Sequence, residues 1–533
     1  MLKTLFILPP AFWVTMLLLV VGALWAIKQI KNGVGLPMLA VLGTVAVWYA
    51  GDVLYNNYAG DYATNFDSAT LDGAWWEVAL FVGVFLVVMP LMHKLINRRH
   101  LRRGSQVSLM LQRGANHPTF QLHLNQLFWG CVSVWAVLSV VGAARLGINE
   151  SLYYFFPFLG HKADPWGRGR IGGGIDALLS LAAYVQMFVA AIFGVVAALA
   201  RERRVRFLAL AACLIAWPWY VIGRTRNTML AVLMPAILAW VFLRLRGGVW
   251  QKLIALGAFF LLINAWFGFV IANRSNMDIA AAVEQKGFSL EQDEDVHHEG
   301  LNMYEELCWI NKLTADGSYS QKPGHEYLAE IANPIPRTLW PEKPLIGIDY
   351  AVARGLAWDR GDAGVAATLS TGMIGQGVIN FGRFAGPAFA ALLMALWAAM
   401  LARLDLEGQR VGRIPLYALG LILTFNLGRD ITLITLYTFI FGSAIVWWLE
   451  RSYRGFERKT KGRRRRVADE DRLAEAAEPA GLDNQAPQTT GRRPGFHWWK
   501  NSDVKTEAAL ASKPSDPQDS TVELKSGKPE FKF

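Results

Sequence analysis

The chain has 533 residues, of which 53% are hydrophobic and 21 are tryptophan, and its mean hydropathy is positive. This composition excludes a soluble enzyme carried on one anchor and is typical of an integral membrane protein. The net charge of +11 lies mostly in loops and the carboxy-terminal tail, where a positive-inside bias and attraction to anionic lipid explain it better than nucleic-acid binding.

Apolar runs dominate the chain up to residue 450. Roughly eleven of them can cross about 30 Å of hydrocarbon as helices, so we expect an all-α polytopic membrane protein with about 10–12 transmembrane helices. The candidate runs lie near residues 5–27, 34–50, 75–92, 125–144, 175–200, 207–222, 228–243, 253–272, 384–402, 414–428 and 431–449. The first run is too long for the core of a secretory signal and holds Pro9 and Pro10, so we interpret it as a retained span.

Lysine and arginine gather in the loops that follow the odd-numbered runs. Members of this set are Lys28, Lys31, Lys94, Arg98, Arg99, Arg102, Arg103, Arg113, Arg201, Arg203, Arg204, Arg206, Arg244, Arg246, Lys252, Arg403, Arg410 and Arg413. The first opposite loop, between Gly51 and Trp76, has four aspartates and neither lysine nor arginine. The positive-inside rule therefore predicts that the tail is cytoplasmic and that the large hydrophilic loop, 273–365, is extracytoplasmic.

These observations divide the chain into two regions. Residues 1–450 form the membrane domain, which includes the 273–365 loop. Residues 451–533 form a basic tail that is rich in polar residues and has no sustained periodicity. Such a segment cannot bury enough apolar surface to offset its ordering entropy, so we expect it to be disordered.

Within the large loop, the segment NPIPRTLWPEKP (333–344) is rigid and cationic. Each proline fixes φ and removes a hydrogen-bond donor, so the segment cannot form a regular helix. A fixed backbone holds Arg337 and Lys343 in place, which suits anion binding, and Trp340 joins them as a candidate substrate contact. We therefore place substrate binding in this segment.

Arginines also occur at the predicted outer ends of spans, where the orientation rule expects few. They are Arg168 and Arg170 in GRGRIGGG, Arg224 and Arg226 in IGRTRNTML, Arg429 in NLGRDITL, and Arg274 and Arg383. A set of guanidinium groups converging on one face suits phosphate, because the planar fork binds its oxygens in pairs. The alternative for each arginine is a helix cap, a side chain reaching the interface, or a pair with a neighbour such as Asp430.

Carboxylates and histidines of the loop are candidate bases for activating a hydroxyl group. Glu305 and His325 lead, with Glu306 and Glu326 beside them, and the alternative is a solvated acidic face. The HHE triplet at 297–299 lacks the spacing of known metal motifs, so we expect neither metal nor cofactor. The glycine-rich stretch GMIGQGVINFGRFAGP (372–387) predicts a close-packed or re-entrant entry to the ninth span.

Three of these motifs together give the chain a family resemblance. PIPRTLWPEKP, the NFGRFAGP entry to a span and IGRTRNTML resemble motifs of the Wzy-type oligosaccharide repeat-unit polymerases, which are related to O-antigen ligases. The order of a multi-span half, one large external loop and a few final spans is also similar, over residues 1–450. The resemblance implies a GT-C-like helical bundle in the bacterial cytoplasmic membrane.

The resemblance also implies an activity. Such enzymes polymerise oligosaccharide repeat units carried on undecaprenyl diphosphate, outside the cytoplasmic membrane, to make O-antigen, capsule or exopolysaccharide. Arg337, Arg224, Arg226 and Arg429 would stabilise the leaving diphosphate without a metal, and Glu305 or His325 would deprotonate the acceptor. Membrane lipid, a chain-length regulator and a flippase are the expected partners. An O-antigen-ligase-like transferase or a lipid-linked oligosaccharide transporter remains an alternative.

Overall fold

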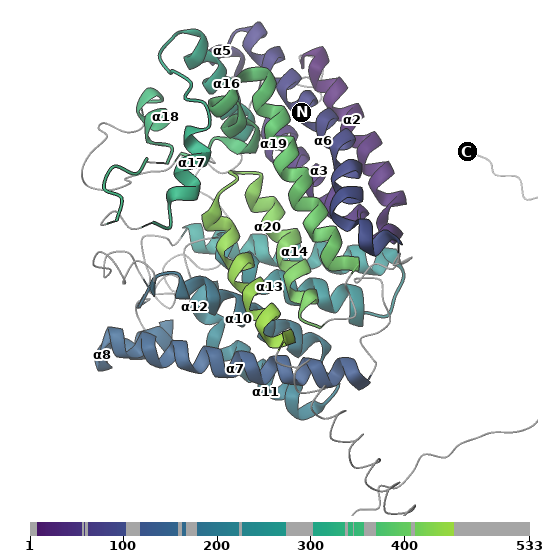
Figure 1. Cartoon of the computed structure of the whole chain (residues 1–533), viewed down its shortest axis with the longest axis vertical. Coiled ribbons are helices and arrows are strands. Elements are labelled where there is room, and N and C mark those ends of the chain that lie inside the picture. Colours follow the sequence, from purple (N-terminus) through teal and green to yellow (C-terminus); the bar gives the residue numbers. More distant parts are fainter. Residues whose placement is uncertain are drawn as a thin grey trace, which may run out of the picture. The chain divides into compact units, whose positions relative to one another are not determined.

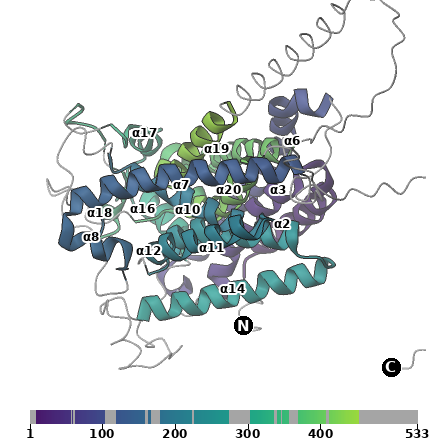
Figure 2. The same ribbon diagram turned by 90° about the horizontal axis from the view of Figure 1, so that it is seen from below.

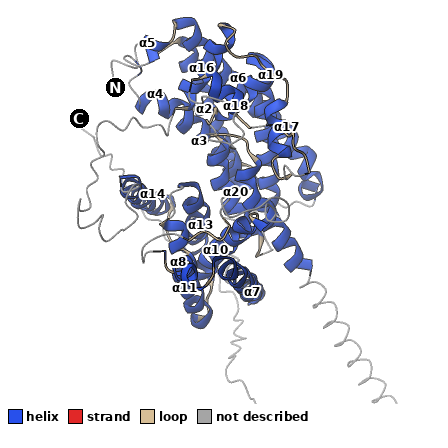
Figure 3. Ribbon diagram, turned by 90° about the vertical axis from the view of Figure 1, so that its left-hand side faces the viewer, coloured by secondary structure: helices blue, strands red, loops and turns tan. Residues whose placement is uncertain are grey.

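The computed structural model describes residues 8–55, 58, 62–102, 118–157, 163–166, 179–222, 226–272, 302–335, 339–344, 346–355, 369–406 and 411–451. Within these ranges the ordered elements are helices, and no strand occurs (Figure 3). The chain divides into two compact units, Met1–Lys461 and Gly462–Phe533, and the second lies outside the described residues together with the predicted tail from 452.

Eight helical stretches of the described chain are long and apolar enough to cross a membrane, so the protein is a helical membrane protein. They are Pro10–Lys28, Gly35–Leu54, Ser68–Arg99, Phe120–Leu146, Ala182–Leu199, Asn227–Arg244, Gly372–Asp405 and Leu433–Arg451. Two shorter apolar helices, Trp250–Ile263 and Arg413–Leu427, accompany them. Each of these ten stretches coincides with one of the apolar runs in the sequence.

The remaining predicted run, 207–222, does not form one continuous helix, and the sequence explains why. It is split into two short helices, Arg203–Ala216 and Pro218–Val221. Pro218 has no amide hydrogen to continue the first helix, and three arginines lower the hydropathy of its first turns. Within the described residues, eight helices are therefore clear candidates for membrane spans, and several apolar helices are shorter.

The helices keep the labels of Figure 1. Those in and beside the apolar stretches are α2 (Pro10–Lys28), α3 (Gly35–Val45), α4 (Asp52–Tyr55), α6 (Ser68–Arg102), α7 (Pro118–Leu146), α8 (Ile148–Phe155), α10 (Ala182–Leu199), α11 (Arg203–Ala216), α12 (Pro218–Val221), α13 (Arg226–Ala239), α14 (Val249–Ala272), α19 (Gly372–Leu406) and α20 (Arg413–Leu427). The short α5 (Ala63–Asn65) precedes α6, and the loop helices are α16 (Met303–Ala315), α17 (His325–Ala332) and α18 (Ile348–Ala353).

Two sets of helices pack within the first unit. One contains α2, α3, α6 and α19, and the other contains α7, α10, α11 and α13, with α20 in contact with α3, α13 and α19 (Figure 1). Seen from below, α11 lies between α7 and α14 (Figure 2). Large side chains such as Trp75, Phe81 and Phe85 are buried between helices. Many apolar side chains instead face outward, as expected where hydrocarbon surrounds the helices.

The glycine-rich entry to the ninth span is a tight helical hairpin within α19. The backbone leaves helical geometry at Gly382, whose φ is +78°, a conformation that favours glycine. Gly377 and Gly386 then meet backbone to backbone, since a Cβ on Gly377 would lie 2.3 Å from the Gly386 carbonyl oxygen. The rings of Phe381 and Phe389 also contact each other across the turn, with centroids 4.7 Å apart and planes tilted by 59°. The predicted close-packed entry is confirmed.

Candidate functional site

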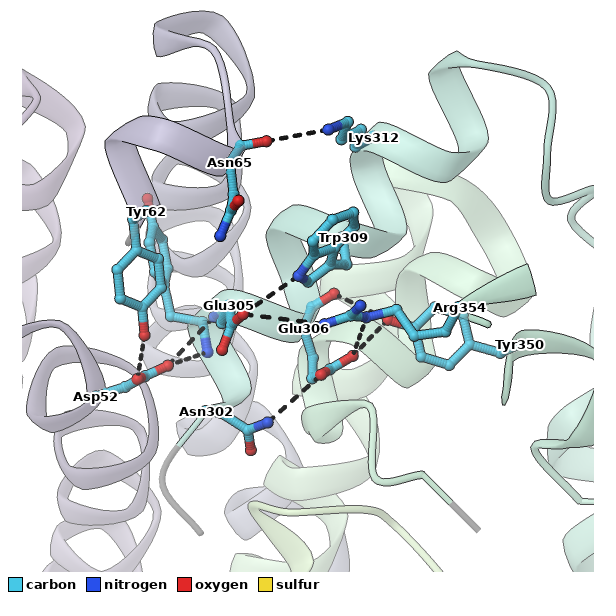
Figure 4. A network of polar contacts seen from close by, with 11 residues as sticks. Asp52, Tyr62, Asn65, Asn302, Glu305, Glu306, Trp309, Lys312, Tyr350 and Arg354 are labelled. Atoms are coloured by element: carbon cyan, nitrogen blue, oxygen red, sulfur yellow. Dashed lines mark hydrogen bonds and ion pairs between the residues drawn. The ribbon is translucent and has the colours of Figure 1, made fainter. Parts of the chain in front are cut away.

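The loop helix α16 is fastened to the amino-terminal helices through Asp52, whose side chain is fully buried. The Asp52 carboxylate accepts hydrogen bonds from the Tyr62 hydroxyl at 2.6 Å and from the backbone amides of Tyr304 and Glu305 at 2.8 and 3.2 Å (Figure 4). A carboxylate at a helix amino terminus satisfies amides that have no partner within the helix and complements the helix dipole. Asp52 therefore holds the start of α16 against α4.

The candidate base Glu305 belongs to a network that joins α16 to α18 (Figure 4). The Arg354 guanidinium lies over the Trp309 ring at 4.0 Å and forms ion pairs with Glu306 at 3.5 Å and Glu305 at 3.9 Å. The Tyr350 hydroxyl donates to the Glu306 carboxylate at 2.6 Å. Burial raises the pKa of Glu306, and these partners oppose that rise. The arrangement gives Glu305 a structural task in holding α18 on α16.

Arg383, another sequence candidate, follows the break at Gly382 and pairs with a buried carboxylate. Its Nε lies 2.5 Å from Oε1 of Glu77 on α6, and the second oxygen of Glu77 accepts from the Asn311 amide at 3.0 Å. A buried carboxylate is stable when it is paired and hydrogen-bonded in this way. Arg383 thus ties the α19 hairpin to α6 and α16.

An acidic cluster lies where α17 meets the α19 hairpin and the loop after α20. It consists of Glu326, Glu330 and Asp430, which lie within electrostatic reach of one another. Glu326 and Glu330 are one helical turn apart and share a face of α17. The Glu326 carboxylate accepts from the Gly347 amide at 2.8 Å, which connects the cluster to the start of α18.

Glu330 is the most unusual member of the acidic cluster because it is only 3% exposed. One carboxylate oxygen, Oε2, accepts from the Leu433 amide at 3.2 Å. The other, Oε1, is closed to solvent and finds no hydrogen-bond donor among the described residues. Burial, with the charges of Asp430 and Glu326, raises the pKa of Glu330 to about 7. Glu330 can therefore exchange a proton at neutral pH.

Asp430 and its neighbours fix the loop after α20 against the α19 hairpin. Oδ1 of Asp430 accepts from the Thr371 amide at 3.0 Å and from its hydroxyl at 3.2 Å, beside the start of α19. Gln376 accepts from the Ile431 amide at 2.9 Å, which adds a second link. Burial raises the pKa of Asp430 to about 6, although hydrogen bonds and the Arg429 charge oppose the rise.

Arg429 lies at the surface end of this cluster. Its side chain is exposed, and its Nε donates to the Ser370 hydroxyl at 2.7 Å. That single hydrogen bond uses one of the five donors of a guanidinium group, which suits Arg429 to an anion approaching from outside. His325 begins α17, next to Glu326, and is half-buried. Of the sequence candidates, Arg429 and His325 thus lie at the elements that form the acidic cluster.

The proline segment begins directly after α17 and is closed on itself by Lys343. The Lys343 ammonium donates to the carbonyl oxygens of Asn333 and Ile335, both at 2.9 Å. These bonds join Lys343, near the end of the segment, to two residues at its beginning, so Lys343 has a structural role there. Trp340 is 36% exposed at the same loop. Arg337 itself lies outside the described residues.

Several other predicted site residues also fall outside the described ranges. They are Arg168, Arg170, Arg224 and Arg274. The helix α13 begins at Arg226, whose side chain is not among those described. The HHE triplet at 297–299 likewise lies outside, and within the described residues no group of three His, Cys, Asp or Glu side chains is placed to hold a metal ion.

Comparison with protein-family models, with curated proteins and with solved structures gives no match for this chain. The resemblance to Wzy-type polymerases therefore stands on the sequence motifs alone.

The sequence pattern alone does not single out Glu330 or Asp430 as a base, although both are prominent in the structure. It indicates Asp430 only as a pairing partner for Arg429. The feature of the sequence that could have indicated Glu330 is its spacing. It lies one helical turn after Glu326, on the last helix before the proline segment. Burial is what distinguishes Glu330 from the many exposed loop carboxylates, and burial depends on the fold.

Proposed function

We propose that the protein is a membrane-embedded glycosyltransferase that polymerises oligosaccharide repeat units carried on a polyprenyl diphosphate. The architecture would be a GT-C-like bundle in the bacterial cytoplasmic membrane, with the α16–α18 loop on the outer face. The proposal combines the charge pattern and motifs of the sequence with the acidic cluster at α17.

The observation that carries the proposal is the position of Glu330. A buried carboxyl group with a pKa near 7 lies on the helix that leads directly into the cationic proline segment. Asp430, in the loop after α20, lies within electrostatic reach of Glu330, and Arg429 precedes Asp430 in that loop. A base beside guanidinium groups is the combination that glycosyl transfer from a diphosphate requires.

The proposed reaction joins two lipid-linked glycans. The acceptor sugar hydroxyl attacks the anomeric carbon of the donor, so that a new C–O bond forms as the C–O bond to the lipid diphosphate breaks. The bonding electron pair leaves with the diphosphate, and Glu330 takes the hydroxyl proton. Because Oε1 of Glu330 is closed to solvent, the acceptor has to displace side chains around α17 to reach it.

Stabilisation of the leaving diphosphate falls to the arginines. Arg429 is exposed beside the acidic cluster, and Arg337 belongs to the cationic proline segment of the sequence. Fixed guanidinium groups stabilise developing phosphate charge without proton exchange, since arginine stays protonated.

Surface glycans of a deletion strain test the proposal. Loss of a polymerase leaves glycans of a single repeat unit, and re-expression of the chain restores the long polymer. Long polymer that is not attached to its final acceptor would identify a ligase instead. Lipid-linked material trapped inside the cell would identify a transporter. Either of these two outcomes overturns the proposal.

A further inference from the structure

The helix α17 exposes its apolar side chains and buries its charged ones. Leu328 and Ile331 are 50% and 65% exposed. Glu326 and Glu330, by contrast, are buried against the rest of the protein. Ile335, just after the helix, continues the exposed apolar face at helical spacing. A helix on a surface that faces water has the opposite arrangement, with its charged residues outside. The exposed face of α17 therefore suits surroundings less polar than water.

The helix α17 is hydrogen-bonded to the start of a candidate membrane span. The Glu330 carboxylate accepts from the backbone amide of Leu433 at 3.2 Å. Leu433 is the first residue of the span Leu433–Arg451, so its amide has no acceptor within that helix. The carboxylate on α17 supplies the missing acceptor. The helix α17 therefore lies at the depth at which this span enters the hydrocarbon.

The helix α17 also packs on the span that contains the α19 hairpin. The Tyr327 ring contacts Phe381 and Phe389, on the two segments of the hairpin, with centroids 6.1 and 5.3 Å away. Both phenylalanines belong to the candidate span Gly372–Asp405. Figure 1 shows α17 on the side of α19 away from α2. Phe384, in the first turn after the break in the hairpin, is 84% exposed. The apolar exterior of this span thus extends to the level of α17.

The proline segment after α17 adds two more exposed apolar side chains. Leu339 is 78% exposed, and the neighbouring Trp340 is exposed as well. Tryptophan is enriched where proteins cross the membrane–water interface, because its ring is apolar and its N–H group can stay hydrated. The exposed apolar surface therefore continues from α17 into the segment that follows it.

We propose that α17 lies in the interfacial layer of the bilayer, with the face formed by Leu328, Ile331 and Ile335 in contact with lipid. An apolar face can also be covered by protein, but α17 joins two spans at the depth where lipid surrounds them. Interfacial helices sink their apolar face about 5–10 Å into the boundary between headgroups and acyl chains. Lipid contact at this face depends neither on the transfer reaction nor on which side of the membrane holds the loop.

Spin labels on α17 test this proposal in the full chain, reconstituted in phosphatidylcholine vesicles. One label is attached at Ile331→Cys and another, in a separate protein, at Leu328→Cys. The native cysteines are buried, and wild-type protein treated in parallel gives their background. Oxygen concentrates in hydrocarbon, whereas a nickel chelate stays in water. The ratio of oxygen to nickel collisions should be several-fold higher at both α17 positions than at Ser318→Cys, in the exposed turn after α16.

The same measurement distinguishes lipid from the other surroundings of this face. A ratio on α17 equal to that at Ser318→Cys would place the face in water and overturn the proposal. Protection of the α17 labels from both reagents would show that a second copy of the chain or another protein covers the face, which would also overturn it. Size-exclusion elution before reconstitution checks folding. Because Leu328 and Ile331 share one face, either labelled protein that elutes like the wild type decides the outcome.

Discussion

At the scale of single residues, the carboxyl group of Glu330 differs from the exposed acids of the same loop in its surroundings. Its side chain is buried beside Asp430, which raises its pKa to about 7, whereas Glu342 in the proline segment is exposed. Both are glutamates within the same loop, so a comparison of the two separates the effect of burial from that of charge alone.

Substitution Glu330→Gln should reduce polymer synthesis by about a hundredfold or more, as expected for loss of a general base. In the wild type the rate should rise as pH increases through about 7, because only the deprotonated carboxylate accepts a proton. Purified protein supplied with lipid-linked repeat units gives the rate at each pH. Glu342→Gln should retain both the rate and its pH dependence. Full activity in Glu330→Gln would exclude it as the base.

Glu330 should also affect the thermal stability of the protein, and its raised pKa determines whether substitution stabilises or destabilises the fold at a given pH. The folded state favours the neutral carboxyl group, so its stabilising contribution is complete below its ordinary pKa of 4.5 and is lost as pH rises through about 7. Glutamine imitates the neutral form at every pH. The Tm of Glu330→Gln should therefore exceed that of the wild type at pH 8 and converge with it near pH 4.

Arg337 is proposed to bind the diphosphate, held by prolines 334, 336 and 341. Arg337→Ala should lower polymer yield on the order of a hundredfold, as for removal of a preorganised electrostatic contact. Arg337→Lys should also impair turnover, since it keeps the charge but loses the paired donors. The comparison uses a deletion strain with matched protein levels and Lys286→Ala as the control. Equal yields from Arg337→Ala and the control would leave the segment as a structural brace.

At the scale of elements, the α19 hairpin contacts the acidic cluster through Asp430 and also carries Arg383. The contact between Gly377 and Gly386 lets its two helical segments meet, and a side chain at either position would collide with backbone. Gly83 lies within α6, and an added Cβ there would meet nothing within 4 Å. These glycines therefore differ in packing although all three are helical.

Gly377→Ala and Gly386→Ala should each lower the Tm and the yield of folded protein, since overpacking a tight contact costs roughly 1–3 kcal/mol. Gly83→Ala should be neutral or slightly stabilising, because alanine favours a helix. Fluorescence-detected size-exclusion chromatography after heating gives the Tm in detergent. A loss of stability in Gly83→Ala equal to that in Gly377→Ala would show that the hairpin contact is not what matters.

The sequence predicted the helical spans well, because hydrocarbon imposes long apolar runs that are visible locally. The site was harder to predict, because its contacts join distant positions. Asp52 caps a helix 252 residues later, and Arg383 pairs with a carboxylate 306 residues earlier. Composition also could not show which acid is buried, so Glu305 was preferred to Glu330. The glycine-rich stretch was recognised because tight turns have a local signature.

At the scale of the whole molecule, the distribution of charge predicts which ends of the helices face the cytoplasm. The loop helices α16–α18 lie between Met303 and Ala353, in the loop that the charge pattern places outside. The proposed reaction depends on this orientation, because repeat units are joined on the outer face. A direct measurement of sidedness therefore bears on both the topology and the function.

Cysteine labelling can determine the orientation with little background. The three native cysteines, Cys131, Cys213 and Cys308, are buried and should react slowly. Ser318→Cys introduces an exposed thiol in the turn after α16, and Ser502→Cys introduces one in the tail. A membrane-impermeant maleimide should label Ser318→Cys in intact spheroplasts, whereas Ser502→Cys should react only after the membrane is permeabilised. The reverse pattern would place α16–α18 inside the cell and would contradict both the topology and the proposed polymerase.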